Sequence, residues 1–389
     1  MILEGPNIEH QSHANTTKEH IAIALSELLM FNIVKRSHAS SGIRHNKERD
    51  TPLPIYLSML IHAKTRKREL IDTMFNLWLC VSYDRLMNIS TDLGNTVCKR
   101  YHSEQVVCPP QLKSGVFTCG AVDNIDHNPS AMMAKDAFHG TAISLMQFPT
   151  AEMQGEDRGG TAIDPDVANQ KTIAPLPVTY TMVPPVTNTQ EPTVPPKQGV
   201  LEADPIMISE DMEKEQQWLV HMETILSKVN LDLEDYLSCS AYHASQQPLM
   251  AKCLTSIGLL PLFCDNAHTT CMISHAMEMV KNATHHLNPE QIPVVVVDQP
   301  LYAIAKSVQW TWPVTHGEDK IVVMMGSLHI EMHLLKLLGD WLRESGWTTL
   351  LLQAEITTSG RAEAMLSGTQ VTRTRYAHHV TAASLRILQ

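Results

Sequence analysis

Two short runs of purely apolar residues, each followed by a helical segment, constrain the fold of this chain more than any other feature. Val294–Val297 ends at Asp298, and Ile321–Met325 leads through Gly326 into a helix expected over 328–343. A strand that is apolar on both faces is typical of a parallel sheet covered by helices. Two consecutive strand–helix units therefore predict an α/β sheet.

Other strands and a helical region are expected before these units. Val116–Val122 is apolar and ends at Asp123, and residues 138–148 form a second candidate strand. The residues before 113 follow a helical pattern. The expected organisation is an all-α domain over 1–112, an α/β core over 113–150 and 240–389, and an insertion over 151–239.

The insertion differs from the rest of the chain in composition and charge. Residues 151–205 are rich in Pro and Thr and have little to bury, whereas a helix is expected near 206–237. Residues 151–240 hold 16 Asp+Glu and 5 Lys+Arg, a net charge of −11, which equals that of the whole 389-residue chain. The remainder is nearly neutral, so the overall charge does not argue against a nucleic-acid partner.

The densest basic run lies in the helical N-terminal part and consists of Lys64, Arg66, Lys67 and Arg68. Such a run contacts phosphate or acts as a nuclear import signal, and it equally forms a solvated helix face. We take these four residues as the candidate DNA-binding residues.

Acidic residues follow the expected strands. Functional groups of open α/β sheets gather beyond the carboxyl ends of the strands. Asp123 directly ends the first strand, and Asp126 lies three residues later, so we favour Asp123 over Asp126. Asp298 ends the valine strand, although an acid before Gln299 and Pro300 is also typical of a helix start.

Glu331 lies near the start of the helix that follows the next strand. It shares one stripe with Leu328, Leu335, Leu338 and Leu342, so we expect its carboxylate to point toward the sheet. A carboxylate that faces a core needs a proton, a partner or a metal. The alternative is a favourable interaction with the positive end of the helix.

The order Asp, Asp, Glu, with 32 residues between Asp298 and Glu331, is that of the RNase H-like fold and of many DDE transposases. In that geometry two divalent cations polarise a phosphate and activate the attacking oxygen. Mg²⁺ or Mn²⁺ is the expected cofactor because these ions take oxygen ligands. We therefore expect an RNase H-like mixed sheet with flanking helices.

Several segments resemble a group of uncharacterised, multicopy animal proteins that derive from mobile elements. They are VDNIDHNPS at 122–130, AKDAFHGTAISLMQ at 134–147, VDQPLYAIAKSVQWTWP at 297–313, GSLHIEMHLLKLLGDWL at 326–342 and VTRTRYAHHVTA at 371–382, with KTRKRELID and VSYDRLMNISTDLGN nearer the N-terminus. The resemblance covers most of the chain outside 151–205. It implies a DDE-type nuclease or transposase that cleaves or transfers DNA strands.

The same resemblance assigns roles to individual residues. It implies that Asp123, Asp298 and Glu331 bind the metal, and that Asp126, His139 and His329 are nearby helpers. Members of the group are usually longer than this chain, so a truncated and inactive copy is the alternative expectation.

Other functions are less compatible with the sequence. In the segment from His329 to His333, Glu331 stands two residues after the first His, whereas zinc proteases need it directly after that His. A non-enzymatic alternative is a decayed or domesticated transposase that binds nucleic acid or acts as a scaffold. A third is a helical adaptor with a groove and no acid cluster. Because the sequence shows no secretory signal and no membrane-length apolar run, we expect a nuclear or cytoplasmic protein without a membrane partner.

Overall fold

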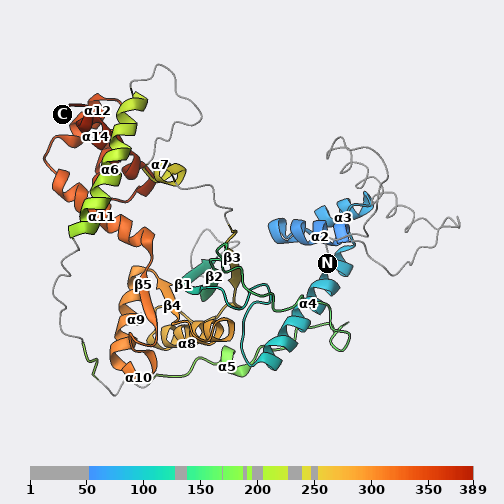
Figure 1. The fold of residues 1–389 in the computed structure, drawn as a ribbon. Helices are drawn as coiled ribbons and strands as arrows, with labels where there is room; N and C mark the ends of the chain where they lie inside the picture. Colours follow the sequence, from blue (N-terminus) through green and yellow to red (C-terminus); the bar gives the residue numbers. More distant parts are fainter. Residues whose placement is uncertain are drawn as a thin grey trace. The chain divides into compact units, whose positions relative to one another are not determined.

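The structure is a computed structural model that describes residues 52–127, 138–168, 170–186, 191–194, 205–226, 239–246 and 253–388. The chain forms two compact units, Met1–Gln105 with Thr161–Pro177, and Val106–Gly160 with Val178–Gln389. Part of the expected insertion, residues 161–177, therefore belongs with the N-terminal helices. Figure 1 shows the elements of each unit.

The described part of the first unit is built on three helices, α2 (Pro52–Thr65), α3 (Arg68–Asn76) and α4 (Tyr83–Glu104). Helix α4 begins at Ser82, whose side chain accepts the N–H of Arg85. The buried side chain of Asn95 donates to the carbonyl of Thr172 at 3.2 Å and accepts the N–H of Ala174 at 2.7 Å. This amide holds the irregular segment 161–177 against α4, because both its donor and its acceptor are satisfied by that backbone.

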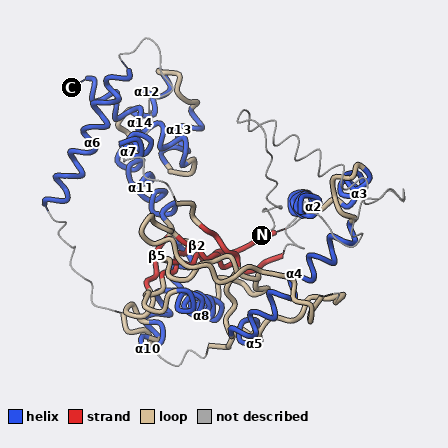
Figure 2. Tube along the Cα trace, turned by 45° about the vertical axis from the view of Figure 1, so that its right-hand side comes forward, coloured by secondary structure: helices blue, strands red, loops and turns tan. Residues whose placement is uncertain are grey.

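The second unit contains a five-stranded sheet made of β1 (Thr118–His127), β2 (Phe138–Gln147), β3 (Ser256–Leu259), β4 (Val294–Val297) and β5 (Val322–Met325). The strand order is β3-β2-β1-β4-β5. Strand β2 is antiparallel to both of its neighbours, whereas β1, β4 and β5 run parallel. Figure 2 shows the strands in red among the helices of the unit. The expected α/β class, with a mixed sheet and flanking helices, is confirmed.

The first strand is longer than the sequence indicates. The expectation that it ends at Asp123 is wrong, because β1 continues to His127. The ladder with β2 pairs Asp123 with Ala142 and Asp126 with His139, so the antiparallel neighbour extends the strand beyond its apolar part.

Helices α8 (Thr270–Leu287) and α9 (Gln299–Thr311) cover one face of the sheet, and the short α10 (Pro313–His316) follows (Figure 1). Val122, Ile143 and Val297 form a buried row across three strands on this face. At Gly120 an added Cβ would lie 2.5 Å from both methyl carbons of Val280 in α8. Only glycine allows α8 to approach the central strand this closely.

The opposite face of the sheet is more open, contrary to the expectation of strands buried on both sides. Val322 and Met324 of β5 are 39% and 50% exposed, and Val294 and Val296 of β4 are half-buried. The apolar runs therefore predicted strand position correctly and the coverage of this face incorrectly.

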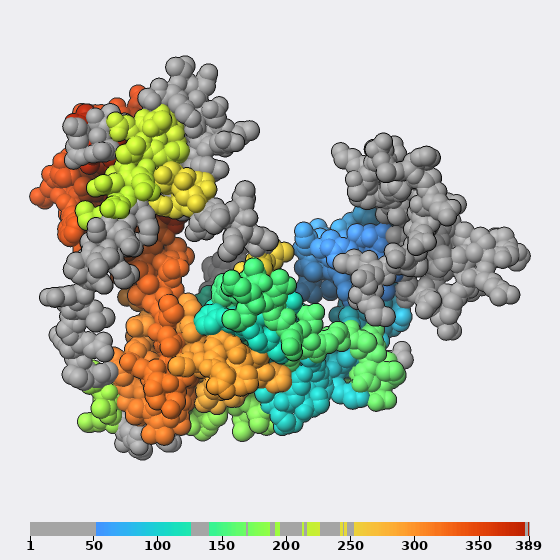
Figure 3. Space-filling model, viewed as in Figure 1, coloured from blue at the N-terminus to red at the C-terminus, as the bar shows by residue number. Residues whose placement is uncertain are grey.

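The remaining elements are helical. They are the short α5 (Val178–Thr181), α6 (Pro205–Leu226), α7 (Cys239–Gln246), α11 (Ser327–Leu342), α12 (Trp347–Gln353), α13 (Ser359–Leu366) and α14 (Val371–Leu388). Trp218 and Met222 of α6 pack with Ala383 of α14, and Figure 3 shows α6 in yellow-green against the orange and red C-terminal residues. The helix expected near 206–237 is thus α6, and 227–238 lies outside the described residues. In the described part of the chain, no helix has the length and apolar character needed to span a bilayer.

Candidate functional site

Asp123 and Asp298 lie at the same edge of the sheet, each one residue beyond the last paired residues of β1 and β4. The ladder between these strands ends with Val122 paired to Val297; Asp123 is the next residue of β1, and Asp298 directly follows β4 and is the N-cap of α9. Adjacent strands are about 5 Å apart, which is the spacing of the last paired residues. The pairing of β1 with β4 thus brings two acids that are far apart in the sequence to the same edge of the sheet.

Asp123 projects on the more open face of the sheet. Val122 and Val297 are 2% and 3% exposed and face α8. Because successive side chains of a strand alternate between faces, Asp123 points to the opposite side. Asp298 lies beyond the end of β4 and turns its carboxylate to the first turn of α9. Asp123 is exposed and Asp298 is half-buried, so a solvent-borne cation or phosphate can reach them.

Each aspartate uses one carboxylate oxygen for its own backbone surroundings. Oδ1 of Asp298 accepts the N–H of Leu301 at 2.9 Å and caps α9, with Pro300 in the first turn. Oδ1 of Asp123 accepts the N–H of Asn124 at 2.8 Å. The helix-start role expected for Asp298 is therefore confirmed. Within the described residues the other oxygen of each carboxylate makes no hydrogen bond.

Glu331 is held by a partner from another helix. Nε of Arg375 in α14 donates to Oε1 of Glu331 at 2.6 Å, and its Nη2 donates to Oε2 at 2.6 Å. This two-point ion pair lowers the pKa of the Glu331 carboxyl and raises the pKa of the Arg375 guanidinium. The carboxylate of Glu331 is therefore neutralised by a basic partner, and neither a proton nor a metal is needed for this.

The expectation that the Glu331 stripe faces the sheet is wrong. Of the leucines on that stripe, Leu335 is buried, whereas Leu328 and Leu338 are 54% and 38% exposed. Helix α11 packs against α13 and α14, so its inner side faces other helices. Helix α11 still begins beside the acids, because the N–H of Gly326 donates to the carbonyl of Val297 at 2.8 Å.

The described residues contain no group of three His, Cys, Asp or Glu side chains placed to hold a metal ion. Asp123 and Asp298 are nevertheless a suitable start for one, because Mg²⁺ is commonly bound through one or two carboxylates and several waters. Glu331 is committed to Arg375. The backbones of Asp126 and His139 pair across β1 and β2, and their side chains lie outside the described residues.

The other expected helper, His329, lies on the polar side of α11. Its carbonyl makes a 2.7 Å hydrogen bond with Nδ1 of His333, one turn later. His333, Lys336 and Asp340 follow on the same side and are exposed. The structure therefore groups His329 with surface residues of its own helix.

The turn between α2 and α3 exposes all four residues of the basic run, Lys64, Arg66, Lys67 and Arg68. Arg68 is partly neutralised, because its Nε lies 3.3 Å from Oδ2 of Asp72 and its guanidinium stacks on the ring of Tyr83. Among the described residues Lys64 and Lys67 form no ion pair. These two lysines are the members of the run most available to a phosphate.

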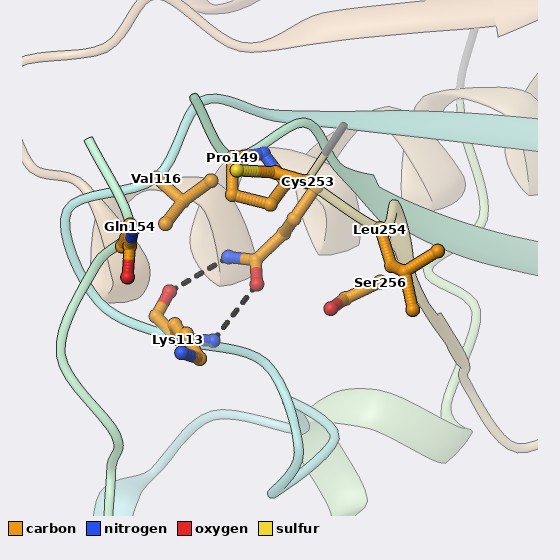
Figure 4. A pocket seen from close by; sticks show the side chains of 8 residues that line it. Lys113, Val116, Pro149, Gln154, Cys253, Leu254 and Ser256 are labelled. Atoms are coloured by element: carbon orange, nitrogen blue, oxygen red, sulfur yellow. Dashed lines mark hydrogen bonds between the residues drawn. The ribbon is translucent and has the colours of Figure 1, made fainter. Parts of the chain in front are cut away.

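A cavity of about 230 Å³ lies at the other end of β1 (Figure 4). The side chain of Gln147 at its wall donates to the carbonyl of Lys113 at 2.7 Å and accepts the N–H of the same residue at 2.8 Å. Gln147 pairs with Thr118, which is five residues and roughly 17 Å along the strand from Asp123. None of the described residues that line the cavity is Asp, Glu or His, so these lining residues are separate from the acids.

Comparison with known proteins supplies one match. Residues 215–388 match a family described as Domain of unknown function (DUF8702). The match covers 174 of the 389 residues and runs from within α6 to the end of α14. It contains Asp298, Glu331 and Arg375 and does not reach Asp123. No curated protein and no solved structure matches the chain.

Arg375 is the residue at this site that sequence reasoning missed. It lies in the segment VTRTRYAHHVTA at 371–382, which carries part of the family resemblance. Three arginines fall within α14, and helical spacing alone does not indicate which of them meets a given acid of α11. The sequence indicated only that basic residues occur on a predicted helix that comes after Glu331 in the chain.

Proposed function

We propose that this chain is a transposon-derived, DDE-type nuclease or transposase-like protein with an RNase H-like core, which cleaves or transfers DNA strands with Mg²⁺ or Mn²⁺. The observation that carries the proposal is the register of β1 and β4, whose last pair, Val122 and Val297, immediately precedes Asp123 and Asp298. These two strands are the central parallel pair of the sheet, and their carboxyl ends are where ligands of α/β sheets bind.

The connectivity of the sheet supports the RNase H-like assignment. The chain makes three antiparallel-connected strands, β1, β2 and β3, and then two strand–helix units, β4–α9 and β5–α11. Strand β2 alone runs against the others. The three expected acids follow the order of these elements. Asp123 lies in β1, Asp298 directly follows β4, and Glu331 lies in α11, the helix after β5.

The proposed roles follow from the carboxylate oxygen of each aspartate that makes no hydrogen bond with another described residue. Oδ2 of Asp123 and Oδ2 of Asp298 would hold the cation, while Oδ1 of each fixes the orientation of its own side chain. A bound divalent cation supplies charge neutralisation on a phosphate and lowers the pKa of a coordinated water. The capping bond makes Asp298 the better positioned of the two, because α9 holds its carboxylate in place.

The test is a cleavage and metal-binding experiment on the full chain. Labelled single-stranded and duplex DNA would be incubated with Mg²⁺ or Mn²⁺, and Mn²⁺ binding would be followed separately by electron paramagnetic resonance. Asp298→Asn removes the charge and retains a residue that caps helices well, so its fold is preserved. Asp157→Asn is the matched control. Asp157 is an exposed acid that pairs with Lys113, a residue located before the start of β1 and away from Asp123 and Asp298.

We expect Asp298→Asn and Asp123→Asn to lose both Mn²⁺ binding and DNA cleavage, and Asp157→Asn to retain both. Cleavage that survives Asp298→Asn would refute the nuclease proposal. Loss of cleavage in all three variants would show that the effect does not come from the acids.

The second candidate function is non-enzymatic: a decayed or domesticated transposase that binds nucleic acid or acts as a scaffold. The ion pair between Glu331 and Arg375 favours it, since the third expected metal ligand is occupied. DNA binding would then rest on the basic run, which also suits nuclear import. Lys64→Ala with Lys67→Ala is expected to reduce the slope of log affinity against log salt by about 2, one for each lost phosphate contact.

Lys171→Ala is the control for that experiment, because Lys171 is an exposed lysine of the same unit outside the run. DNA binding with an unchanged salt slope in the double variant would exclude the run as the contact surface. Metal-independent binding without cleavage would favour the scaffold over the nuclease.

A further inference from the structure

Helix α11 carries a straight apolar stripe on its solvent side. The stripe consists of Ile330, Leu334, Leu337 and Trp341, which are 43%, 56%, 49% and 73% exposed. The intervals are four, three and four residues, which is the heptad spacing of helices that pack side by side. A single exposed leucine needs no explanation, but four large side chains in one row at this spacing indicate a contact surface.

The stripe is distinct from the side of α11 that builds its own unit. The inner side contains Leu335 and Gly339, both buried, and it packs on α13 and α14. Helical geometry places the stripe roughly 150° around the helix from these residues. The helix is therefore apolar on two sides, and its own unit accounts for only one of them.

We propose that the stripe binds the same stripe of a second copy of this chain, with the two α11 helices antiparallel. A twofold axis across the helix pairs each stripe with itself, which is the commonest way in which proteins form homodimers. In this register Leu334 packs against Leu337 of the second copy, and Ile330 packs against Trp341. The antiparallel orientation also sets the helix dipoles favourably.

The polar side chains that border the stripe are compatible with this orientation. His333 and Asp340 lie on its polar side and are exposed, and Asp340 also pairs with Lys336 at 2.7 Å and with Arg343 at 3.1 Å in its own chain. An antiparallel copy brings His333 of each chain alongside Asp340 of the other, and the twofold axis repeats the contact. A parallel copy would instead bring Asp340 near the apolar Leu338. On the opposite border Leu338, which is 38% exposed, extends the apolar surface.

The size of the surface suits a reversible dimer. The stripe and Leu338 together offer on the order of 500 Å² of apolar area per copy, of which Trp341 supplies the largest part. Two copies would then bury on the order of 1,000 Å², which is the lower end of specific interfaces. We expect association roughly in the micromolar range, weaker than that of an obligate dimer.

The test is sedimentation equilibrium of the full chain from about 1 to 100 µM, a range that brackets the expected dissociation constant. The wild-type chain is expected to shift from monomer to dimer across this range. Leu337→Glu, at the centre of the stripe, is expected to weaken association by at least about 30-fold, as charged substitution of an interface anchor does. Leu350→Glu is the matched control, because Leu350 of α12 is 58% exposed and lies outside the stripe.

A second pair of variants tests the orientation. An oxidised mixture of Ile330→Cys and Trp341→Cys chains is expected to form a disulfide between the two variants, because positions 330 and 341 face each other in the antiparallel register. A monomer at every concentration, or a dimer that Leu337→Glu leaves intact, would overturn the proposal. Equal weakening by Leu350→Glu and Leu337→Glu would overturn it as well. A disulfide between positions 330 of two Ile330→Cys chains would overturn the antiparallel register.

Discussion

Gly339 lies at the point where α11 and α13 approach most closely, and its replacement by alanine tests the helical packing around Glu331. An added Cβ at Gly339 would lie 1.9 Å from the carbonyl oxygen of Leu366 and 2.6 Å from its carbonyl carbon. Both neighbours are backbone atoms, which cannot rotate away as a side chain can. The two helices would have to separate by more than 1 Å to reach even a 3.0 Å contact.

The expected magnitude follows from two opposed effects. Alanine in the interior of a helix is favoured over glycine by about 1 kcal/mol. Overpacking against rigid neighbours costs about 1–3 kcal/mol, and a backbone clash belongs at or above the upper limit. The expected net effect of Gly339→Ala is therefore destabilisation by about 2 kcal/mol, or a fall in Tm of roughly 4–8 °C for a domain of this size.

The assay is thermal unfolding followed by circular dichroism, repeated in guanidinium chloride to obtain the free energy of unfolding. Gly360→Ala is the matched control: Gly360 lies in the first turn of α13, and its added Cβ meets nothing within 4 Å. This control is expected to be neutral or stabilising by up to about 1 kcal/mol. A Gly339→Ala variant as stable as the wild-type chain would refute the close approach of α11 and α13.

Three further predictions concern Asp298, the ion pair of Glu331 and the half-buried His378. Asp298→Ala should cost about 1 kcal/mol through loss of the α9 cap, whereas Asp298→Asn should cost much less, measured by guanidinium unfolding. Arg375→Ala should lower the free energy of unfolding by at most about 1 kcal/mol, because Arg375 and Glu331 are 47% and 30% exposed. The ion pair lowers the pKa of Glu331, so its contribution is present above pH 4.5 and is lost as pH falls below that value. The stabilities of the wild-type and Arg375→Ala chains should therefore converge in acid. His378 stacks on Trp347, and burial lowers the pKa of its imidazole. The unfolded chain therefore protonates this imidazole at a higher pH than the folded chain does, and the stability of the fold should fall as pH drops below 6.5. His378→Phe should make this loss of stability smaller, as measured by thermal unfolding at several pH values.

Much of the fold was predictable because its strands carry local signals. The four valines of β4 and the capping pattern at Asp298 and Pro300 are set by short-range chemistry, and both are found where the sequence indicates. β2 was likewise expected over 138–148 and occupies Phe138–Gln147. Strand β3 was not predicted, because its four residues, from Ser256 to Leu259, contain a glycine, and that glycine is their only buried residue.

The candidate site was predictable only in part, for a physical reason. Asp123 and Asp298 meet because β1 and β4 pair in a register that neither strand specifies alone. Glu331 was placed by helical periodicity, but α11 has leucines on more than one side. Helical periodicity alone therefore does not determine whether Glu331 faces a sheet or another helix. The partner it found, Arg375, stands 44 residues further along the chain.

The connection between β2 and β3 has a consequence for how the sheet is assembled. Gln147 pairs directly with Ser256, yet 108 residues of chain lie between them. Closing such a loop costs about 3 kcal/mol more entropy than closing a four-residue turn, since each doubling in length adds about 0.6 kcal/mol. The same intervening segment also separates β1 from β4 in the sequence. Formation of both the β2–β3 and the β1–β4 pairings therefore requires closure of this long loop. A shortened chain in which a tight turn joins Gln147 to Ser256 should therefore form its sheet faster, while its C-terminal helices lose the contact with Trp218.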